Sequence, residues 1–283
     1  MDIDPLQNLF YGKEDILSFI FFVAALAVAS CTKNAVTGRS QLKLLPESSL
    51  QSMALTQYQD VLSKSKVVTP GSNKDAEMVS RVGDRIRRAV KSYYSSKGLS
   101  KQLEGYKWEY NLIESDEANA WCMPGGKIVV YTGLLPYTQN ETALAVVLGH
   151  EVSHAIFQHG NERMSQQMGV EAVNLGLDVA LANKPTETKN LFMGAIGAGE
   201  QYGVLLPFSR KDEYEADHYG LIWAAMAGYN PQEAIPLWER MEKAGGGQRP
   251  PEYESTHPTE EHRIEQLKKW MPEAMKYYKP SGG

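Results

Sequence analysis

The chain of 283 residues has few cysteines, no excess of basic charge and no apolar run long enough to span a bilayer. Its two cysteines, Cys31 and Cys122, stand in unrelated contexts, whereas a disulfide framework needs more cysteines at closer spacing. Lysine and arginine together number 29 against 34 aspartate and glutamate residues, which argues against a protein that binds nucleic acid. Repeats are also missing, so the composition indicates a globular chain of one large domain or two small ones.

The longest apolar run, residues 16–29, is typical of the apolar core of a signal peptide. The small residues Ala29 and Ser30 then precede Cys31, and polar residues follow it. This arrangement resembles a bacterial lipobox, in which the cysteine is lipidated and becomes the first residue of the mature protein. Acidic residues before the run depart from the positive charge with which a signal peptide begins. A cleaved signal or a short anchor with an incidental cysteine is the alternative.

These features predict a lipid anchor and a division of the chain. A lipid on Cys31 would hold the protein to a bacterial membrane with its domain facing the periplasm, and Thr32 favours the outer membrane over the inner one. The segments expected are a signal peptide, a polar tether, one domain and a tail, at residues 1–30, 31–46, 47–275 and 276–283.

Periodic patterns within the domain predict mostly helices. Proline opens a helix over residues 47–65, and apolar residues four apart form one stripe on a helix over residues 75–94. From Glu141 onward the chain is expected to be helical, beginning with residues 141–159. The apolar stretch 191–199 is too short to cross a membrane and is expected to form a lid, a plug or an internal helix.

Strand patterns occur only before the helical part. Residues 106–113 alternate aromatic and polar side chains, which predicts a half-buried strand. The turn Pro124-Gly125-Gly126 precedes a second expected strand at residues 127–131. The fold class is therefore α+β, mainly α-helical, with a small sheet or hairpin next to the helix at residues 141–159.

Two histidines stand four residues apart on that helix. His150 and His154 project from the same side, one turn apart, and such imidazoles reach a common zinc ion at about 2.0–2.2 Å. Glu151 follows His150 directly and is rotated by about 100° round the helix axis. For this stretch alone, histidines hydrogen-bonded within a core are the alternative.

Carboxylates downstream supply what the histidine pair lacks, because a catalytic zinc site needs a third protein ligand. Glu213 and Asp217 are again four residues apart on one face of an expected helix. Glu213 is therefore a candidate third ligand. Asp217 can accept a hydrogen bond from the ring N–H of a ligand histidine, and we assign it to His150 in preference to His154. Glu215 is a rival ligand but points about 200° away from that face. An acidic solvated surface is the alternative.

A third group lies near the end of the chain. His257 stands before Pro258, which is expected to start a helix that contains Arg263. A histidine in this position can stabilise charge on an attacked carbonyl oxygen. A capped helix with a surface histidine is the alternative.

Four segments, in this order, resemble metallopeptidase family 48, the minigluzincins that include HtpX-type, CAAX-prenyl-protease-type and Oma-type enzymes. They are NAWCMPGGKIVVYTGLL, LGHEVSHAIFQHG, SRKDEYEADHYG and STHPTEEHR. The resemblance implies a zincin-type metallopeptidase domain with one zinc ion per chain. It implies His150, His154 and Glu213 as zinc ligands and Glu151 as the catalytic base, with Asp217 as the partner of a ligand, and His257 and Arg263 as the pair that positions substrate and stabilises the intermediate.

The resemblance also implies an edge strand beside the cleft, which an extended substrate joins through main-chain hydrogen bonds. Its residues are Gly126, Lys127, Ile128, Val129, Val130 and Tyr131. The remaining histidines, His159, His218 and His262, match no ligand position, and His159 is expected to be structural.

We therefore expect a zinc metalloendopeptidase that cleaves misfolded or envelope polypeptides in the periplasm. The chain lacks the multiple spans of many family members, so it resembles the lipoprotein-type branch, which removes the case for prenylated substrates. A chaperone or assembly factor that holds unfolded envelope proteins, with little or latent proteolysis, is the alternative. A latent enzyme, in which His257 occupies the open zinc position, is a further hypothesis.

Overall fold

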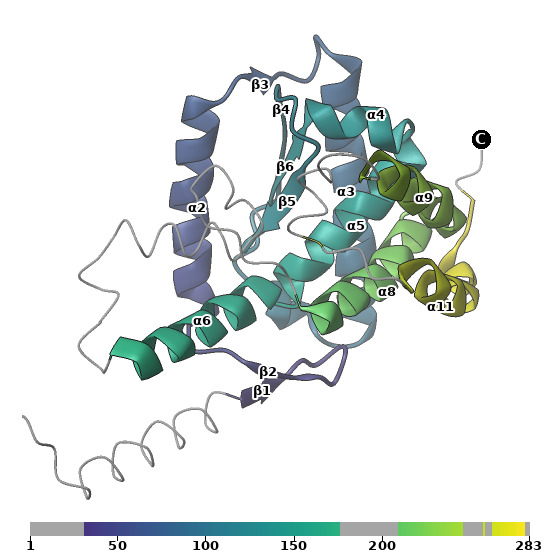
Figure 1. The fold of residues 1–283 in the computed structure, drawn as a ribbon. Helices are drawn as coiled ribbons and strands as arrows, with labels where there is room; N and C mark the ends of the chain where they lie inside the picture. Colours follow the sequence, from purple (N-terminus) through teal and green to yellow (C-terminus); the bar gives the residue numbers. More distant parts are fainter. Residues whose placement is uncertain (1–30, 176–208, 246–256, 258–261, 281–283) are drawn as a thin grey trace, which may run out of the picture.

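The structure, a computed structural model, describes residues 31–175, 209–245, 257 and 262–280 (Figure 1). Helices predominate among these residues and surround a small sheet, which confirms the mainly helical α+β class. The apolar run 16–29, the apolar stretch 191–199 and Pro258 lie outside the described residues. Among the described helices, none is long and apolar enough to cross a membrane.

The helices follow the predicted periodicity closely at the start of the domain. The two predicted helices at residues 47–65 and 75–94 are present, and the side chain of Asn73 caps the second by accepting bonds from two backbone N–H groups. The principal helices are α2 (Glu47–Lys64), α3 (Lys74–Ser96), α4 (Leu135–Thr138), α5 (Glu141–Ile156), α6 (His159–Leu175), α8 (Arg210–Met226), α9 (Ala234–Gly245) and α11 (Arg263–Tyr277).

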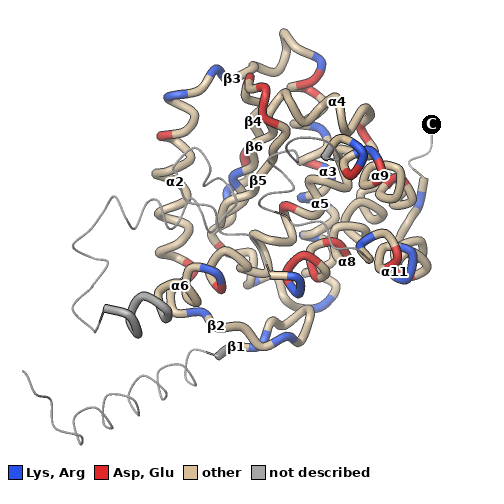
Figure 2. The backbone as a smooth tube through the Cα atoms, in the orientation of Figure 1, with Lys and Arg blue, Asp and Glu red and all other residues tan. Residues whose placement is uncertain are grey.

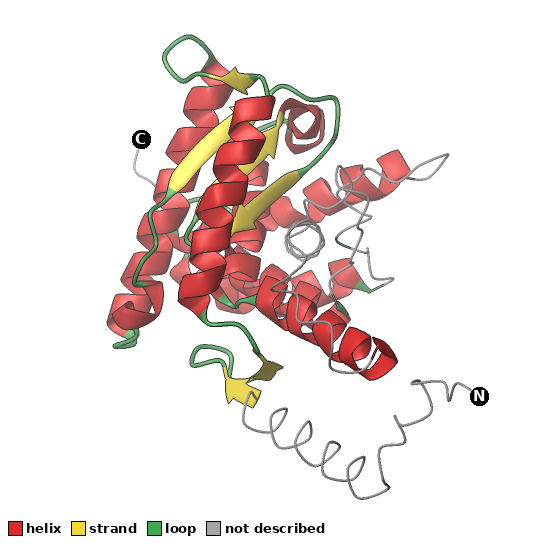
Figure 3. Ribbon diagram, turned by 90° about the vertical axis from the view of Figure 1, so that its left-hand side faces the viewer, coloured by secondary structure: helices red, strands yellow, loops and turns green. Residues whose placement is uncertain are grey.

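The main sheet is covered on both faces. Its strands lie in the order β3 (Val67–Val68), β4 (Glu109–Ile113), β6 (Lys127–Tyr131) and β5 (Ala120–Met123). Along β6, Ile128 and Val130 pack into the core formed with α3 and α5, whereas Val129 and Tyr131 pack towards α2. Figure 3 shows α2 lying across its face of the sheet. Because both faces are buried, β6 is apolar at successive positions.

The interpretation of residues 126–131 as an edge strand is wrong. β6 runs parallel to β4 on one side and antiparallel to β5 on the other, so its backbone hydrogen-bonding groups are shared between two neighbours. Among the described strands, β5 is the outer one on this side of the sheet, and it lies next to α5. The hairpin turn is at the predicted place, with Gly125 and Gly126 at positive φ angles of 83° and 80°.

Helices α5 and α8 form the most extensive helix contact in the described chain. They approach closely at two glycines, since a Cβ atom on Gly149 would lie 2.7 Å from the carbonyl oxygen of Gly220. The helix expected over residues 141–159 is divided: α5 ends at Ile156, Gln158 adopts a positive φ of 59°, and α6 starts at His159.

The segment expected to be a tether, residues 31–46, is folded against the domain instead. It forms an antiparallel hairpin of β1 (Cys31–Lys33) and β2 (Ser40–Leu42), which lies below α6 in Figure 1. Beyond the hairpin, the N–H of Leu44 donates to Ser165 Oγ at 2.9 Å. The polar residues that suggested a solvated tether are therefore partners for polar groups on α6 and α8.

Candidate metal centre

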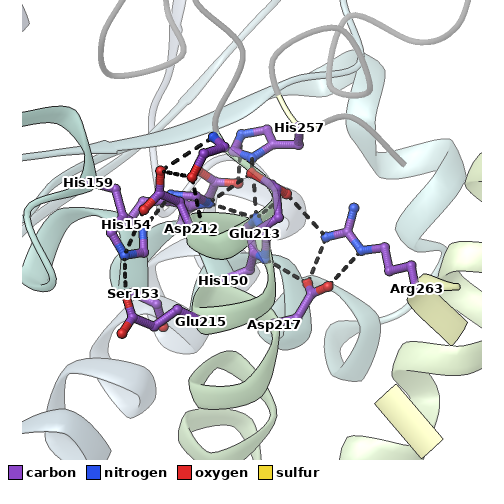
Figure 4. Close-up of polar contacts among 12 residues, drawn as sticks. His150, Ser153, His154, His159, Asp212, Glu213, Glu215, Asp217, His257 and Arg263 are labelled. Carbon is purple, nitrogen blue, oxygen red and sulfur yellow. Dashed lines mark hydrogen bonds and ion pairs between the residues drawn. The ribbon is translucent and has the colours of Figure 1, made fainter. Parts of the chain in front are cut away.

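Three side chains expected as metal ligands converge where α5 crosses α8 (Figure 4). His150 and His154 lie one turn apart on α5, and their Nε2 atoms are 3.0 Å apart. Glu213 lies in the first turn of α8, with Oε1 3.4 Å from His154 Nε2 and Oε2 3.5 Å from His150 Nε2. All three side chains are buried, so they form an enclosed cluster of nitrogen and oxygen donors.

His257 adds a fourth donor to this cluster. Its Nδ1 atom lies 3.2 Å from His150 Nε2 and 3.0 Å from Glu213 Oε1. A tetrahedral ion with bonds of about 2.0–2.1 Å separates its donor atoms by roughly 3.3 Å. The observed separations scatter around that value, so the four side chains fit a zinc ion in both geometry and chemistry.

The ionisation of the cluster also suits a cation. Burial opposes the charge of Glu213, but the charge of His257 and the hydrogen bonds of His154 and His257 hold the pKa of Glu213 well below its usual value. Burial lowers the pKa of His154, which keeps its ring neutral with a lone pair available. Within the described chain, the buried Oε2 atom of Glu213 accepts no hydrogen bond, and a bound cation would satisfy it.

Asp217 connects the cluster to α11. It lies one turn after Glu213, and its Oδ1 atom is 2.9 Å from His150 Nδ1, the pairing expected from the sequence. Arg263 donates to both oxygens of Asp217, at 2.7 and 2.8 Å, and its guanidinium lies 3.4 Å from the centre of the Trp238 ring. Arg263 therefore contacts the cluster in two ways, through its hydrogen bonds to Asp217 and through a longer ion pair with Glu213 Oε2 at 3.7 Å.

Glu151 faces the cluster without being one of its donors. It follows His150 on α5, is buried, and has its Oε1 atom 3.6 Å from His257 Nε2. On the neighbouring strand, burial and then the negative charge of Glu151 raise the pKa of the Cys122 thiol. The thiol is therefore uncharged beside the cluster at neutral pH, and it is a poor metal ligand in that state.

Sequence reasoning missed the residues behind His154. His159 is buried, with Nδ1 2.9 Å from His154 Nδ1 and Nε2 2.8 Å from Glu215 Oε2. Glu215 in turn accepts a hydrogen bond from Arg39 of the β1–β2 hairpin. On one continuous helix, His159 would point about 140° away from His154. The break before α6 brings the His159 ring into contact with the His154 ring. The only sequence signal for this contact was the third histidine of LGHEVSHAIFQHG.

The other predicted residues lie away from the donor cluster. Figure 2 shows acidic residues gathered at the start of α8; of these, Glu215 faces His159 and Arg39 rather than the donors. His218 pairs with Glu273 at 2.8 Å, and His262 is exposed. Cys31 begins β1, and the residues from Gly126 to Tyr131 form the end of the turn and β6.

Comparisons with known proteins cover the region that carries these side chains. The family model described as Peptidase family M48 matches residues 81–271. The mitochondrial metalloendopeptidase OMA1 of Schizosaccharomyces pombe is 33% identical over 210 residues, which cover 70% of this chain and 59% of the relative. The mitochondrial metalloendopeptidase OMA1 of Homo sapiens is 28% identical over 278 residues, covering 95% of this chain and 51% of the relative.

A bacterial relative is similar over a shorter region. The beta-barrel assembly-enhancing protease of Escherichia coli is 31% identical over 162 residues, which cover 56% of this chain and 33% of that protein. The chain spans about half the length of the curated relatives it matches. The family model covers more than half of this chain and includes both helices of the candidate metal centre. The chain belongs to peptidase family M48.

Proposed function

We propose that the chain is a zinc-dependent metalloendopeptidase that hydrolyses peptide bonds of misfolded or envelope polypeptides. The observation that carries this proposal is the convergence of His150, His154 and Glu213 at tetrahedral spacing beside Glu151. One zinc ion per chain would be held by these three ligands. When bound, zinc lowers the pKa of a coordinated water and polarises the scissile carbonyl group.

The protein's own groups move the protons. Glu151 is buried next to the donors, where it accepts a proton from the attacking water and passes it to the departing amine. Asp217 accepts the Nδ1 proton of His150, which leaves Nε2 of that ring free to bind metal. Arg263 holds both oxygens of Asp217 and so orients the carboxylate for this task.

The position of His257 supports a closed resting state. With His257 as a fourth donor, a tetrahedral ion has no open position, and closed coordination is typical of structural rather than catalytic zinc sites. His257 must therefore leave the cluster before a substrate carbonyl enters. Once displaced, it can donate a hydrogen bond to the oxyanion that forms during attack.

An extended substrate segment is proposed to dock on β5 rather than on β6. β5 is the outer described strand next to α5, and main-chain pairing there would place a substrate beside the metal ligands. Backbone recognition of this kind accepts many sequences, which suits a peptidase that acts on unfolded chains.

We assign the protein to the bacterial cell envelope, with residues 1–30 as signal peptide, a lipid on Cys31 and the domain facing the periplasm. The lipobox-like sequence before Cys31 supports the anchor, and the name of the Escherichia coli relative supports an envelope role. The outer membrane remains favoured by Thr32. The division into a domain at 47–275 and a tail at 276–283 is kept as part of this proposal, with residues 31–46 as a docked arm.

The test uses the full chain and an unfolded polypeptide such as casein. We expect cleavage that a chelator abolishes, and Glu151→Gln should keep one zinc ion per chain while the cleavage rate falls at least about 100-fold. The exposed Glu77→Gln variant is the matched control and should cleave like the wild type. His257→Ala should cleave without the initial lag expected of the wild type.

Four results would each contradict a part of the proposal. Cleavage by Glu151→Gln at the wild-type rate would exclude Glu151 as the base, and chelator-resistant cleavage would exclude a metal mechanism. Suppression of substrate aggregation without cleavage, unaffected by the chelator, would favour the holding function instead. Equal time courses for the wild type and His257→Ala would exclude the closed resting state.

A further inference from the structure

A chain of hydrogen bonds leads from His154 to the N-terminal hairpin. His154 Nδ1 lies 2.9 Å from His159 Nδ1, and His159 Nε2 lies 2.8 Å from Glu215 Oε2. Arg39 Nε donates to the same carboxylate oxygen at 2.9 Å. These hydrogen bonds join the end of α5, the start of α6, the first turns of α8 and the hairpin. Figure 4 shows the part of this relay formed by His154, His159 and Glu215.

If His154 binds a metal, only one arrangement of protons allows both hydrogen bonds of this relay, from His154 to His159 and from His159 to Glu215, to form. If Nε2 of His154 is a ligand, its proton must lie on Nδ1, which then donates to Nδ1 of His159. His159 is then left with its proton on Nε2, and that proton is donated to Glu215. The carboxylate at the end of the chain thus selects the ring tautomer of both histidines.

Arg39 holds the end of this hydrogen-bond relay through three hydrogen bonds. Its guanidinium donates to Glu215, to Glu162 at 2.9 Å and to Asp212 at 2.8 Å, so it joins carboxylates on α6 and α8. His159, Asp212 and Glu215 could by themselves hold a cation. The guanidinium of Arg39 already donates a hydrogen bond to both carboxylates, Asp212 and Glu215, which argues against a second metal site.

We infer that His159, Glu215 and Arg39 are positioning residues for the metal ligand His154, and that the N-terminal hairpin is thereby a working part of the metal centre. The inference rests on the proposed metal site but not on peptidase activity. Asp217 serves His150 directly, whereas His154 depends on a relay that starts outside the helical core. Second partners of this kind change metal affinity about 10- to 100-fold.

The experiment measures the Zn²⁺ dissociation constant of the full chain by competition with a chromophoric chelator. His159→Leu removes the acceptor for His154 and should raise the dissociation constant about 10- to 100-fold. In His159→Asn, the amide oxygen can still accept from His154 Nδ1, so affinity should be partly restored. Arg39→Gln should weaken binding several-fold, and the double variant Arg39→Gln/His159→Leu should bind no more weakly than His159→Leu alone.

The control and a second measurement separate positioning from simple packing. Arg81→Gln removes an arginine that donates to Glu141 at the start of α5, without a link to the donor cluster, and should leave Zn²⁺ affinity unchanged. The melting temperature of each metal-free variant reports packing. Equal losses of affinity and equal falls in melting temperature for His159→Leu and His159→Asn would overturn the inference in favour of a structural role.

The side chain of Arg39 is 21% exposed, so we expect Arg39→Gln to fold even if His159→Leu does not. The Zn²⁺ affinity of Arg39→Gln can then still be measured. Zn²⁺ affinity within twofold of the wild type for Arg39→Gln would overturn the link to the hairpin. A wild type that binds no Zn²⁺ would overturn the proposed metal site itself. A wild type that binds Zn²⁺ while every relay variant binds equally well would overturn this inference alone.

Discussion

Asp217 serves two partners at once, and both are buried. Its Oδ1 atom is paired with His150, while both of its oxygens accept hydrogen bonds from Arg263. A buried cation that loses its counter-charge is costly, because the low-polarity interior cannot replace the solvation it has given up. The effect of changing Asp217 should therefore appear in the stability of the metal-free chain as well as in metal binding.

Asp217→Asn keeps the shape of the side chain and removes its charge. We expect the free energy of unfolding of the metal-free chain to fall by about 3–5 kcal/mol, measured by urea unfolding, and Zn²⁺ affinity to fall about 10- to 100-fold. Glu114→Gln breaks the exposed ion pair with Lys66 and serves as the control, because exposed pairs contribute little. Similar unfolding midpoints for the two variants would contradict the prediction.

Glu141, at the start of α5, makes stability depend on pH. The hydrogen bond from Arg81 outweighs partial burial and, together with the bond from Tyr229, lowers the pKa of Glu141 below its ordinary value of 4.5. Since the folded-state pKa lies below the unfolded one, ionised Glu141 contributes stability above the unfolded pKa. That contribution is lost as the pH falls through the folded-state pKa.

Urea midpoints measured between about pH 6 and pH 3 test this dependence. The wild-type midpoint should fall more steeply below pH 4.5 than that of Glu141→Gln, which cannot titrate at this position. Parallel curves for the two proteins would show that Glu141 has the same pKa in the folded and unfolded states.

Among the elements, α5 and α8 bring the donors together because their backbones touch. Neither Gly149 nor Gly220 leaves room for a side chain: a Cβ atom on Gly220 would lie 2.9 Å from the backbone nitrogen of His150. Gly149 directly precedes His150, so a wider helix separation at this point would move His150 away from Glu213. The glycine pair therefore sets the spacing of the candidate metal ligands.

Gly149→Ala tests this spacing, and the sign of the effect is diagnostic. In an ordinary helix interior, glycine to alanine stabilises by about 0.5–1 kcal/mol. Here we expect destabilisation of about 1–3 kcal/mol from overpacking and weaker Zn²⁺ binding, measured by urea unfolding and chelator competition. Thr142→Ala, on the same helix away from the crossing, is the control. A more stable Gly149→Ala would contradict the close contact.

Periodicity was sufficient for elements whose burial follows one regular pattern. Helices α2 and α3 and the β5–β6 turn are at their predicted places, because proline, asparagine and glycine act locally. The break at Gln158 and the inner position of β6 were not predicted. The first depends on a positive φ at a residue that rarely adopts one, and the second on long-range pairing with β4.

For the whole molecule, the proposed metal site joins segments that are far apart in the chain. The donors come from α5, from α8 and from residue 257, so an ion can bind them all only in the folded protein. Free Zn²⁺ at 100 times its dissociation constant should stabilise the fold by about 2.7 kcal/mol, or roughly 5–10 °C in Tm. Thermal unfolding of the full chain with and without a chelator measures this.

Glu213→Gln is the control for that measurement. It removes the charged ligand from α8, so the Tm of this variant should respond much less to Zn²⁺. A wild-type Tm that is the same with and without the chelator would contradict metal binding in the folded state.

Local motifs indicated the candidate donors and Asp217, because ligands on a helix follow its period and can be recognised from spacing alone. The relay behind His154 could not be found in this way. Its members come from α6, α8 and the hairpin, and Arg39 lies 176 residues before Glu215 in sequence. Arg39 also lies in a polar stretch without periodicity, so no local pattern distinguished a hairpin packed on the domain from a solvated tether.

If Cys31 carries the proposed lipid, the docked hairpin would limit how far the domain can move from a membrane. A free strand of residues 31–46 could extend about 55 Å, which would let the candidate metal centre move over a wide range of distances from the membrane. Instead, β1 begins at Cys31, and Arg39 fastens the hairpin to α6 and α8. A lipid at Cys31 would thus be joined directly to the folded domain, and the candidate metal centre would stay at a nearly constant height above the bilayer. Only polypeptides that come down to the lipid surface would then be within its reach.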